Sequence, residues 1–304
     1  MPQDHRIAAG RGTVTAPTVR TVAYRQPAGR RAPELDLYLP PEPSATIVYL
    51  HGGGWRRGSR REPLPALGGL AFYEELAGLG FAVAAADYAL SGEARFPAPL
   101  HDVRAAVAWV CEHGPPGVPV YLWGESAGAH LALLAALGAG AEDGADAGGG
   151  RGGAGGRPGL DVAGVVAWYP PTDLLGLPAD LAAIGAPADT GPDSREARML
   201  GAPPSDVPEL ARSAAPTAYA HADAPPVLLM HGAADRMVPP AQSIRLAKAL
   251  RDAGARRVEL DLVPGAGHMW ARVADVAGIV RRTVAFLRSL PDAPGRAAPG
   301  PGQE

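Results

Sequence analysis

The sequence predicts an α/β fold with a mostly parallel sheet that carries helices on both faces. From Thr46 onward, short apolar runs alternate with stretches of helix-forming composition, the pattern of repeated strand–helix units. Several of these runs lack polar–apolar alternation, as expected of strands covered on both faces. The two strand-like segments before Thr46 do alternate, so we expect them to form an antiparallel hairpin at one edge of the sheet.

The expected elements follow from this periodicity in chain order. The hairpin strands are Val19–Tyr24 and Glu34–Leu39. The later strands are Thr46–Leu50, Phe81–Ala86, Val118–Trp123, Val162–Trp168, Val227–Met230 and Val258–Val263. The helices between and after them are Pro65–Leu79, Leu100–His113, Ala127–Leu137, Ala241–Ala253 and Val276–Leu290.

A single domain over residues 1–304 is the expected organisation, with an ordered core at about residues 18–290. The Gly-rich block at 138–159 and the tail at 291–304 lack apolar periodicity and are predicted to be disordered. Residues 171–222 are Pro-rich and too long for a simple connection, so they are predicted to form an irregular or helical flap, a cap-like insertion.

Composition excludes several classes of function. A formal net charge of -3 gives no basic field for nucleic acid. Neither a signal-peptide core nor an apolar stretch long enough to span a bilayer is visible, so a soluble cytoplasmic protein is expected. Cys111 is the one cysteine, which rules out an internal disulfide, and its helix-like surroundings predict a buried structural thiol.

The GESAG motif at residues 124–128 is the first candidate for chemistry. It follows the apolar run VYLW and precedes AHLALLAAL, which is the strand–turn–helix setting of a nucleophile elbow. A serine on so sharp a turn needs small neighbours, and the two flanking glycines supply them. A chance match in a Gly-rich chain is the alternative, but the flanking elements favour Ser126 as a nucleophile.

The HGGGW motif at residues 51–55 follows the strand TIVYL. Consecutive glycines let backbone amides converge on one point, which is how this kind of loop stabilises an oxyanion. The predicted donors are the amides of Gly53, Gly54 and Ala127. His51 is interpreted as structural, fixing the loop by hydrogen bonding.

A serine nucleophile also requires a base and an acid that orients it. Of the eight histidines, His268 lies in a glycine-flanked loop after the last strand, where the base is expected. Asp235 follows the strand VLLM and lies between serine and histidine in the chain, as this arrangement requires. Asp173, after the preceding strand, is the rival acid.

These motifs resemble the HGGG-type esterase branch of the α/β-hydrolases, namely the hormone-sensitive-lipase-like and bacterial feruloyl-esterase-like groups. The matching segments are HGGGW, DYAL, FPAPLHDVRAAVAWV, GESAGAHLALL, HGAADRMVP and PGAGH, which together span about residues 45–290. The resemblance implies the α/β-hydrolase fold with an eight-stranded sheet, a serine-esterase mechanism and no cofactor. It also implies that Glu125 packs under the elbow or bonds to the loop. Ala89 departs from the arginine often found there, as do Ala233 and Ala234 from a frequent acidic residue.

A small-molecule ester of a small to medium acyl group is the expected substrate. Aromatic residues at strand ends or in loops are the candidates for lining its pocket, with plain packing as the alternative: Trp55, Trp168, Tyr169 and Trp270. No HExxH motif, cysteine pair or ligand spacing of histidines points to a metal. An arylformamidase-like or other amide hydrolase, a non-catalytic binding protein, and a homodimer formed through sheet edges stay open as alternatives.

Overall fold

The computed structural model describes residues 16–138, 160 and 162–291. The two segments predicted to be disordered, 138–159 and 291–304, lie outside the described residues apart from Gly138 and Pro291.

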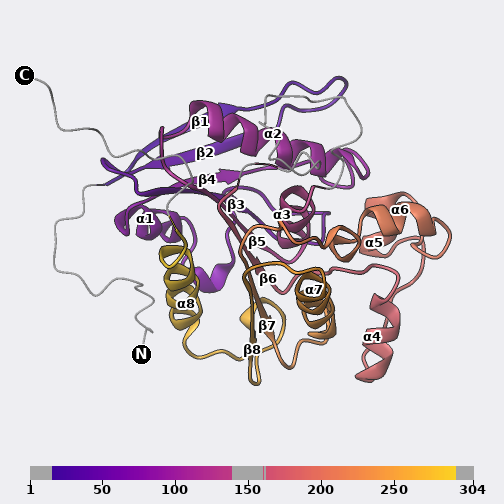
Figure 1. Cartoon of the computed structure of the whole chain (residues 1–304). Coiled ribbons are helices and arrows are strands. Elements are labelled where there is room, and N and C mark those ends of the chain that lie inside the picture. Colours follow the sequence, from indigo (N-terminus) through magenta and orange to yellow (C-terminus); the bar gives the residue numbers. More distant parts are fainter. Residues whose placement is uncertain (1–15, 139–159, 161, 292–304) are drawn as a thin grey trace, which may run out of the picture.

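One eight-stranded sheet forms the centre of the molecule, in the order β1-β2-β4-β3-β5-β6-β7-β8 (Figure 1). The strands are β1 (Thr18–Ala23), β2 (Glu34–Leu39), β3 (Ala45–Leu50), β4 (Phe81–Ala86), β5 (Val120–Glu125), β6 (Gly164–Trp168), β7 (Val227–Gly232) and β8 (Val258–Val263). The first two strands pair antiparallel, as does β2 with β4, and every later pair is parallel. The predicted fold class and the edge hairpin are therefore confirmed.

Helices cover both faces of this sheet (Figure 1). On one face lie α1 (Ala71–Gly78) and α8 (Val276–Arg288), and on the other lie α2 (Ala98–His113), α3 (Ala127–Ala136) and α7 (Ala241–Asp252). The sheet separates two apolar cores, one built on each group of helices. Every residue of α3 is buried, because this helix follows the central strand β5 directly and is covered by its neighbours.

Two expectations from the sequence are wrong. The helix predicted at Pro65–Leu79 is instead a 3-10 turn, Pro65–Leu67, followed by α1, because Gly68 and Gly69 take left-handed φ angles of 85° and 68° that end the first turn. Cys111 is exposed and not buried: α2 turns Val107 and Val110 toward the core, and the next position faces solvent.

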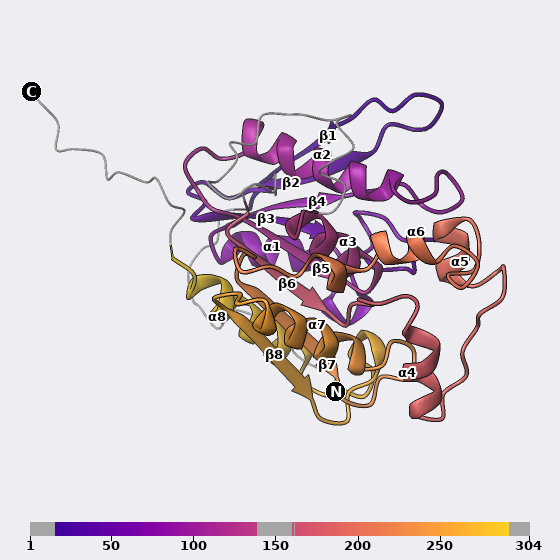
Figure 2. The same cartoon turned by 45° about the vertical axis from the view of Figure 1, so that its right-hand side comes forward.

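The segment 171–222, for which the sequence predicts a flap, contains short helices. They are α4 (Leu177–Ala183), α5 (Arg195–Leu200), α6 (Pro208–Ser213) and a 3-10 turn at Pro216–Tyr219. In Figures 1 and 2 the three α-helices lie outside the layer formed by α3 and α7. The side chain of Ser194 accepts a hydrogen bond from the Ala197 amide and so caps α5.

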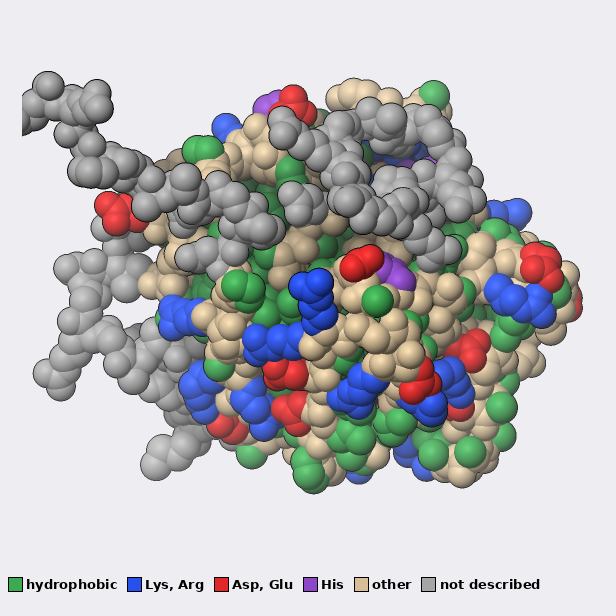
Figure 3. Space-filling model, viewed as in Figure 1, with side chains coloured by type: hydrophobic (Ala, Val, Ile, Leu, Met, Phe, Trp, Pro, Cys, Tyr) green, Lys and Arg blue, Asp and Glu red, His purple; other side chains and the backbone are tan. Residues whose placement is uncertain are grey.

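Surface charges of both signs are mixed. Figure 3 shows basic and acidic side chains interspersed over the lower half of one face. At the edge strand β8 and its flanks, Arg257 pairs with Glu259 and Arg282 pairs with Asp261. Charged side chains on an edge strand oppose pairing with another sheet. In the described part of the chain, no helix has the length and apolarity to cross a bilayer.

Candidate active site

Ser126 stands on the sharp turn between β5 and α3 with φ 52° and ψ -115°. These angles are uncommon for a residue with a side chain, and the surrounding structure must hold them. Its backbone amide donates to the carbonyl of Trp168 at 2.9 Å, which fixes the turn to the end of β6. Other residues with side chains and positive φ stand in nearby loops: Trp55, Tyr169, Met269 and Trp270. Backbone strain is thus concentrated around this serine.

Gly128 packs so tightly that no side chain fits. A Cβ placed there would lie 2.2 Å from the carbonyl oxygen of Leu50 and 2.5 Å from that of His51. We expect Gly128→Ala to force β3 and α3 apart and to destabilise the fold by about 1–3 kcal/mol, with loss of the turn geometry. Thermal unfolding measures this effect. Gly92→Ala, at a site with no atom within 4 Å of the added carbon, is the matched control, and equal stability of the two variants would contradict the expectation.

Ser126, His268 and Asp235 form one hydrogen-bonded row. His268 Nε2 lies 3.1 Å from Ser126 Oγ, and its Nδ1 lies 2.6 Å from Asp235 Oδ2. The loops after β7 and β8 bring the acid and the base together, because Gly232 lets these strand ends approach closely: a Cβ there would lie 2.4 Å from the carbonyl oxygen of Ala266. The imidazole is therefore placed between a hydroxyl and a carboxylate.

The surroundings of Asp235 keep its carboxyl group ionised. Burial alone would raise the pKa of its carboxyl, but hydrogen bonds from His231 and His268 and from the backbone of Val238 outweigh burial and hold the pKa well below its usual range. The amides of Met237 and Val238 donate to Oδ1 at 2.8 and 3.0 Å, which leaves Oδ2 for His268. The carboxylate is thus both charged and fixed in orientation.

Asp173 lies elsewhere. Its carboxylate accepts from the amide of Gly176 at 3.0 Å and lies 3.6 Å from Arg245. It makes no hydrogen bond to His268 in the described structure, so of the two candidate acids only Asp235 reaches the imidazole.

The loop with the HGGGW motif, residues 51–55, is called the glycine loop and lies over the serine. The amides of Gly53, Gly54 and Ala127 make no hydrogen bond to another described residue, which leaves them available to an incoming oxyanion. His51 is buried and stacks on Tyr88 with ring centroids 4.4 Å apart, and its Nδ1 donates to the carbonyl of Gly52 at 2.7 Å. The structural reading of His51 agrees with these contacts.

Glu125 lies beneath the elbow and connects three parts of the site. Its carboxylate accepts hydrogen bonds from Tyr49 at 3.0 Å and from Tyr169 at 2.9 Å. Burial raises its pKa, although the two tyrosines and the backbone of Gly52 act in the opposite direction. Tyr169 in turn lies against the ring of His268, with centroids 4.7 Å apart. Glu125 thus supports both the glycine loop and the imidazole from below.

Of the four aromatic residues predicted to line the pocket, only Trp55 does so. Trp168 is in the core, donating to Thr283 Oγ1 and packing on Trp270 with centroids 5.3 Å apart. Tyr169 and Trp270 are also buried beneath the site. The expectation for these three residues is corrected: Trp168 and Tyr169 lie at the end of β6 and Trp270 in a 3-10 turn, but all three rings point into the apolar layer.

His130 on α3 joins the glycine loop to the flap. Its Nδ1 accepts from the indole of Trp55 at 3.2 Å, and its Nε2 donates to the carbonyl of Ala214 at 2.7 Å. Burial lowers the pKa of His130 to about 4, because the charged form loses its hydration. The neutral imidazole is the form that accepts at one nitrogen and donates at the other.

Acid should therefore weaken the fold through His130. The unfolded state, with a pKa near 6.5, binds the proton first, so the free energy of unfolding falls as pH drops from about 6.5 to about 4, by on the order of 3 kcal/mol. In urea unfolding at a series of pH values, we expect His130→Gln to reduce the slope of the free energy of unfolding against pH. His113→Gln, which removes an exposed imidazole, should leave it as in wild type. A His130 variant with an unchanged slope would contradict the assignment.

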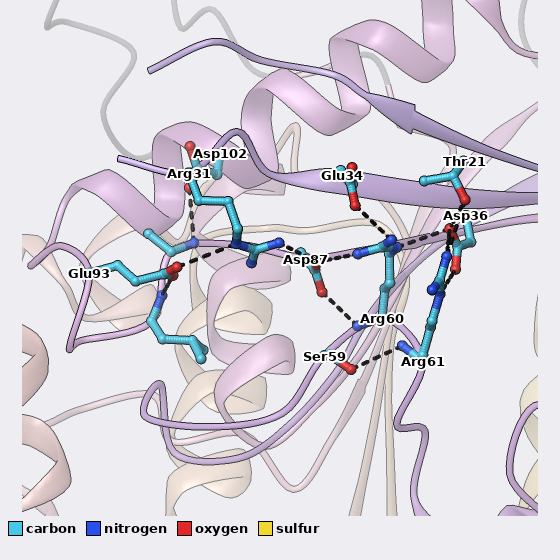
Figure 4. A network of polar contacts seen from close by, with 12 residues as sticks. Thr21, Arg31, Glu34, Asp36, Ser59, Arg60, Arg61, Asp87, Glu93 and Asp102 are labelled. Atoms are coloured by element: carbon cyan, nitrogen blue, oxygen red, sulfur yellow. Dashed lines mark hydrogen bonds and ion pairs between the residues drawn. The ribbon is translucent and has the colours of Figure 1, made fainter. Parts of the chain in front are cut away.

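A network of ion pairs anchors the end of the glycine loop (Figure 4). Arg60 is buried and pairs with Asp87 at 2.6 Å, Glu34 at 2.7 Å and Asp36 at 3.0 Å. Arg61 adds a second contact to Asp36. These pairs tie the loop to the hairpin strand β2 and to the end of β4, and each buried charge in the network has at least two partners.

The backbone of Ala89 contacts a buried acidic residue. The Ala89 amide donates to Asp102 Oδ2 at 2.9 Å, and Asp102 is fully buried. Arg25 and Arg30, from the connection between β1 and β2, supply the guanidinium groups that neutralise this carboxylate. A buried acid is thus satisfied without an arginine at position 89.

A cleft of about 270 Å³ opens over Ser126 and His268. It is lined by Gly52, Gly53, Gly54, Trp55, Arg56, Arg57, Glu125, Ser126, Pro171, Arg195, Glu196, Met237, Val238, His268 and Met269. Sequence reasoning missed Arg195 and Glu196, which α5 brings in from the flap. Arg56 and Arg57 could have been found, because they follow the HGGGW motif directly.

Comparison with known proteins gives the family. The BD-FAE family model matches residues 35–250. Esterase LipQ of Mycobacterium tuberculosis is 32% identical over 264 residues, covering 83% of this chain and 53% of LipQ. The probable carboxylic ester hydrolase LipM of the same organism is 27% identical, covering 89% of this chain and 62% of LipM. The chain spans about half to three fifths of the length of these curated relatives.

Solved structures agree with the fold. A truncated carbohydrate esterase from gut microbiota has a TM-score of 0.69 at 27% identity, covering 90% of this chain and 98% of its own. Esterase 2 of Thermogutta terrifontis has a TM-score of 0.64 at 22% identity, covering 91% of this chain and 92% of its own, and at this identity shows the fold alone. The chain belongs to the BD-FAE family of α/β-hydrolase esterases.

Proposed function

We propose that this protein is a carboxylic ester hydrolase that works through an acyl-enzyme on Ser126. The observation that carries the proposal is the row of hydrogen bonds from Ser126 Oγ through His268 to Asp235. In this mechanism His268 takes the serine proton as Oγ attacks the acyl carbon, and returns it to the leaving alcohol. Water then releases the acid by the same route.

The backbone amides of Gly53, Gly54 and Ala127 are proposed to bind the oxyanion. Their lack of other hydrogen-bond partners supports this role. Removing one donor of this kind typically costs about 3 kcal/mol of transition-state stabilisation. Because they are backbone groups, the three donors depend on the conformation of the glycine loop and not on side chains.

A small to medium acyl group is the proposed substrate feature, supported by the limited volume of the cleft. The esterase names of the relatives favour an ester over the formamide or other amide alternative. The filled serine, histidine and aspartate positions disfavour a non-catalytic binding protein. The single domain with a flap at residues 171–222 is likewise our proposal, supported by the continuous sheet.

The test is hydrolysis of p-nitrophenyl esters from acetate to palmitate, together with labelling by a fluorophosphonate. Turnover with an optimum at short or medium acyl chains would support the proposal. Labelling without ester turnover would move the assignment to an amide or formamide bond. The absence of both ester turnover and fluorophosphonate labelling would overturn the proposal.

A further inference from the structure

The cleft has two chemically different sides. Residues that follow Asp235 and His268, on the loops after β7 and β8, contribute apolar groups: Met237, Val238 and Met269. The segment that follows the HGGGW motif and helix α5 contribute arginines instead: Arg56, Arg57 and Arg195. A neutral aliphatic ester would use the first side only.

Arg195 lies directly against the glycine loop. A Cβ placed on Gly54 would be 2.7 Å from Cδ of Arg195 and 3.4 Å from its Nε. The missing side chain at position 54 therefore makes room for this arginine. Arg195 is exposed to solvent, and its Nε lies beside Gly54, one of the proposed oxyanion donors.

None of the three cleft arginines makes a hydrogen bond or ion pair within 4 Å to a carboxylate among the described residues. Elsewhere the same chain pairs its arginines closely, as Arg60 does with three acidic residues. The two carboxylates that line the cleft, those of Glu125 and Glu196, do little to neutralise the positive charge of these arginines. Glu125 is held from below by two tyrosines, and burial raises the pKa of Glu196, with Arg195 acting weakly in the opposite direction.

We propose that the cleft selects esters that carry a second, anionic group, a carboxylate in the first instance, bound by Arg195 with support from Arg56 and Arg57. A guanidinium binds a carboxylate through two parallel hydrogen bonds, and three such groups around one cleft also attract an anion before contact. The inference rests on the proposed esterase function and names its substrate class.

Two matched pairs of esters test this proposal and locate the anion. On the acyl side, p-nitrophenyl hydrogen glutarate is compared with p-nitrophenyl hexanoate, after subtraction of the uncatalysed rates. On the alcohol side, 4-acetoxybenzoate is compared with 4-acetoxybenzamide. We expect kcat/KM to favour the anionic member of one pair, and the preferred pair shows whether the acid or the alcohol carries the charge.

The selectivity should depend on Arg195. We expect Arg195→Gln to lower the anionic-to-neutral ratio of kcat/KM by at least about tenfold, because the loss of even one charged hydrogen bond has an effect of this size. Arg198→Gln, on the same helix but paired with Asp193 outside the cleft, should keep the wild-type ratio. Hydrolysis of neutral esters with no anionic preference in either pair, or equal ratios in both variants, would overturn the inference and leave the esterase proposal intact.

A readout without turnover separates the two proposals. Glutarate should slow fluorophosphonate labelling of the wild-type protein, and this protection should be lost in Arg195→Gln but kept in Arg198→Gln. Protection with no turnover of any of the four esters would support the anion site while overturning the esterase function. Equal labelling rates with and without glutarate would count against the anion site.

Discussion

Ser126→Ala is expected to lower kcat for p-nitrophenyl ester hydrolysis by about 10⁶-fold and to abolish fluorophosphonate labelling. Alanine lacks the oxygen that attacks the acyl carbon, so no acyl-enzyme forms. The variant should still fold, because the turn at φ 52° is held by backbone bonds such as that from the Ser126 amide to Trp168, and alanine keeps the same Cβ.

The matched control is Ser205→Ala, which removes an exposed hydroxyl in the flap that bonds only to Asp206 in the described structure. It should keep wild-type turnover and labelling. Turnover by Ser126→Ala within tenfold of wild type would refute the assignment of the nucleophile. Melting temperatures of both variants show whether a loss of activity reflects chemistry or unfolding.

Sequence pattern predicted the fold well where one signal dominated. The ranges Glu34–Leu39, Phe81–Ala86 and Val258–Val263 match their strands residue for residue. The second of these is an apolar run between a glycine and an aspartate, and the other two alternate up to a proline, which leaves little freedom in where each strand begins and ends. The break at Gly68 and Gly69 was missed because helix-forming composition on both sides outweighed two residues whose left-handed conformation depends on the tertiary structure.

For the candidate site, the order of motifs along the chain predicted more than the composition did. Ser126, Asp235 and His268 could be placed together because parallel strands end at one edge of the sheet, so loops far apart in sequence converge there. The direction of a side chain could not be read in the same way. Trp168 and Trp270 are predicted to line the pocket, yet their rings pack edge to face within the apolar layer, because the register of β6 sets the direction of Trp168 and a 3-10 turn sets that of Trp270.

The residues that the flap contributes to the cleft could not be predicted from the sequence, for a different reason. Residues 171–222 have weak periodicity, and their helices are short, so their placement depends on contacts with the core such as the bond from His130 to Ala214. Arg195 gave no sequence signal of its own. Its relevance comes from lying against Gly54, a contact between segments about 140 residues apart.

Asp235→Asn is expected to reduce kcat by about 10⁴-fold with little change in stability. The carboxylate now accepts the Nδ1 proton of His268 at 2.6 Å and stabilises the imidazolium that forms during attack. An amide presents either a donor, which favours the tautomer unable to take the serine proton, or a neutral oxygen.

Asp173→Asn, at the rival acid that lies near Arg245, should retain turnover near the wild-type rate. Because the pKa of Asp235 lies well below its usual range, the wild-type rate should not fall through protonation of this carboxyl at mildly acidic pH. A loss of activity in Asp173→Asn with an active Asp235→Asn would reverse the assignment of the acid.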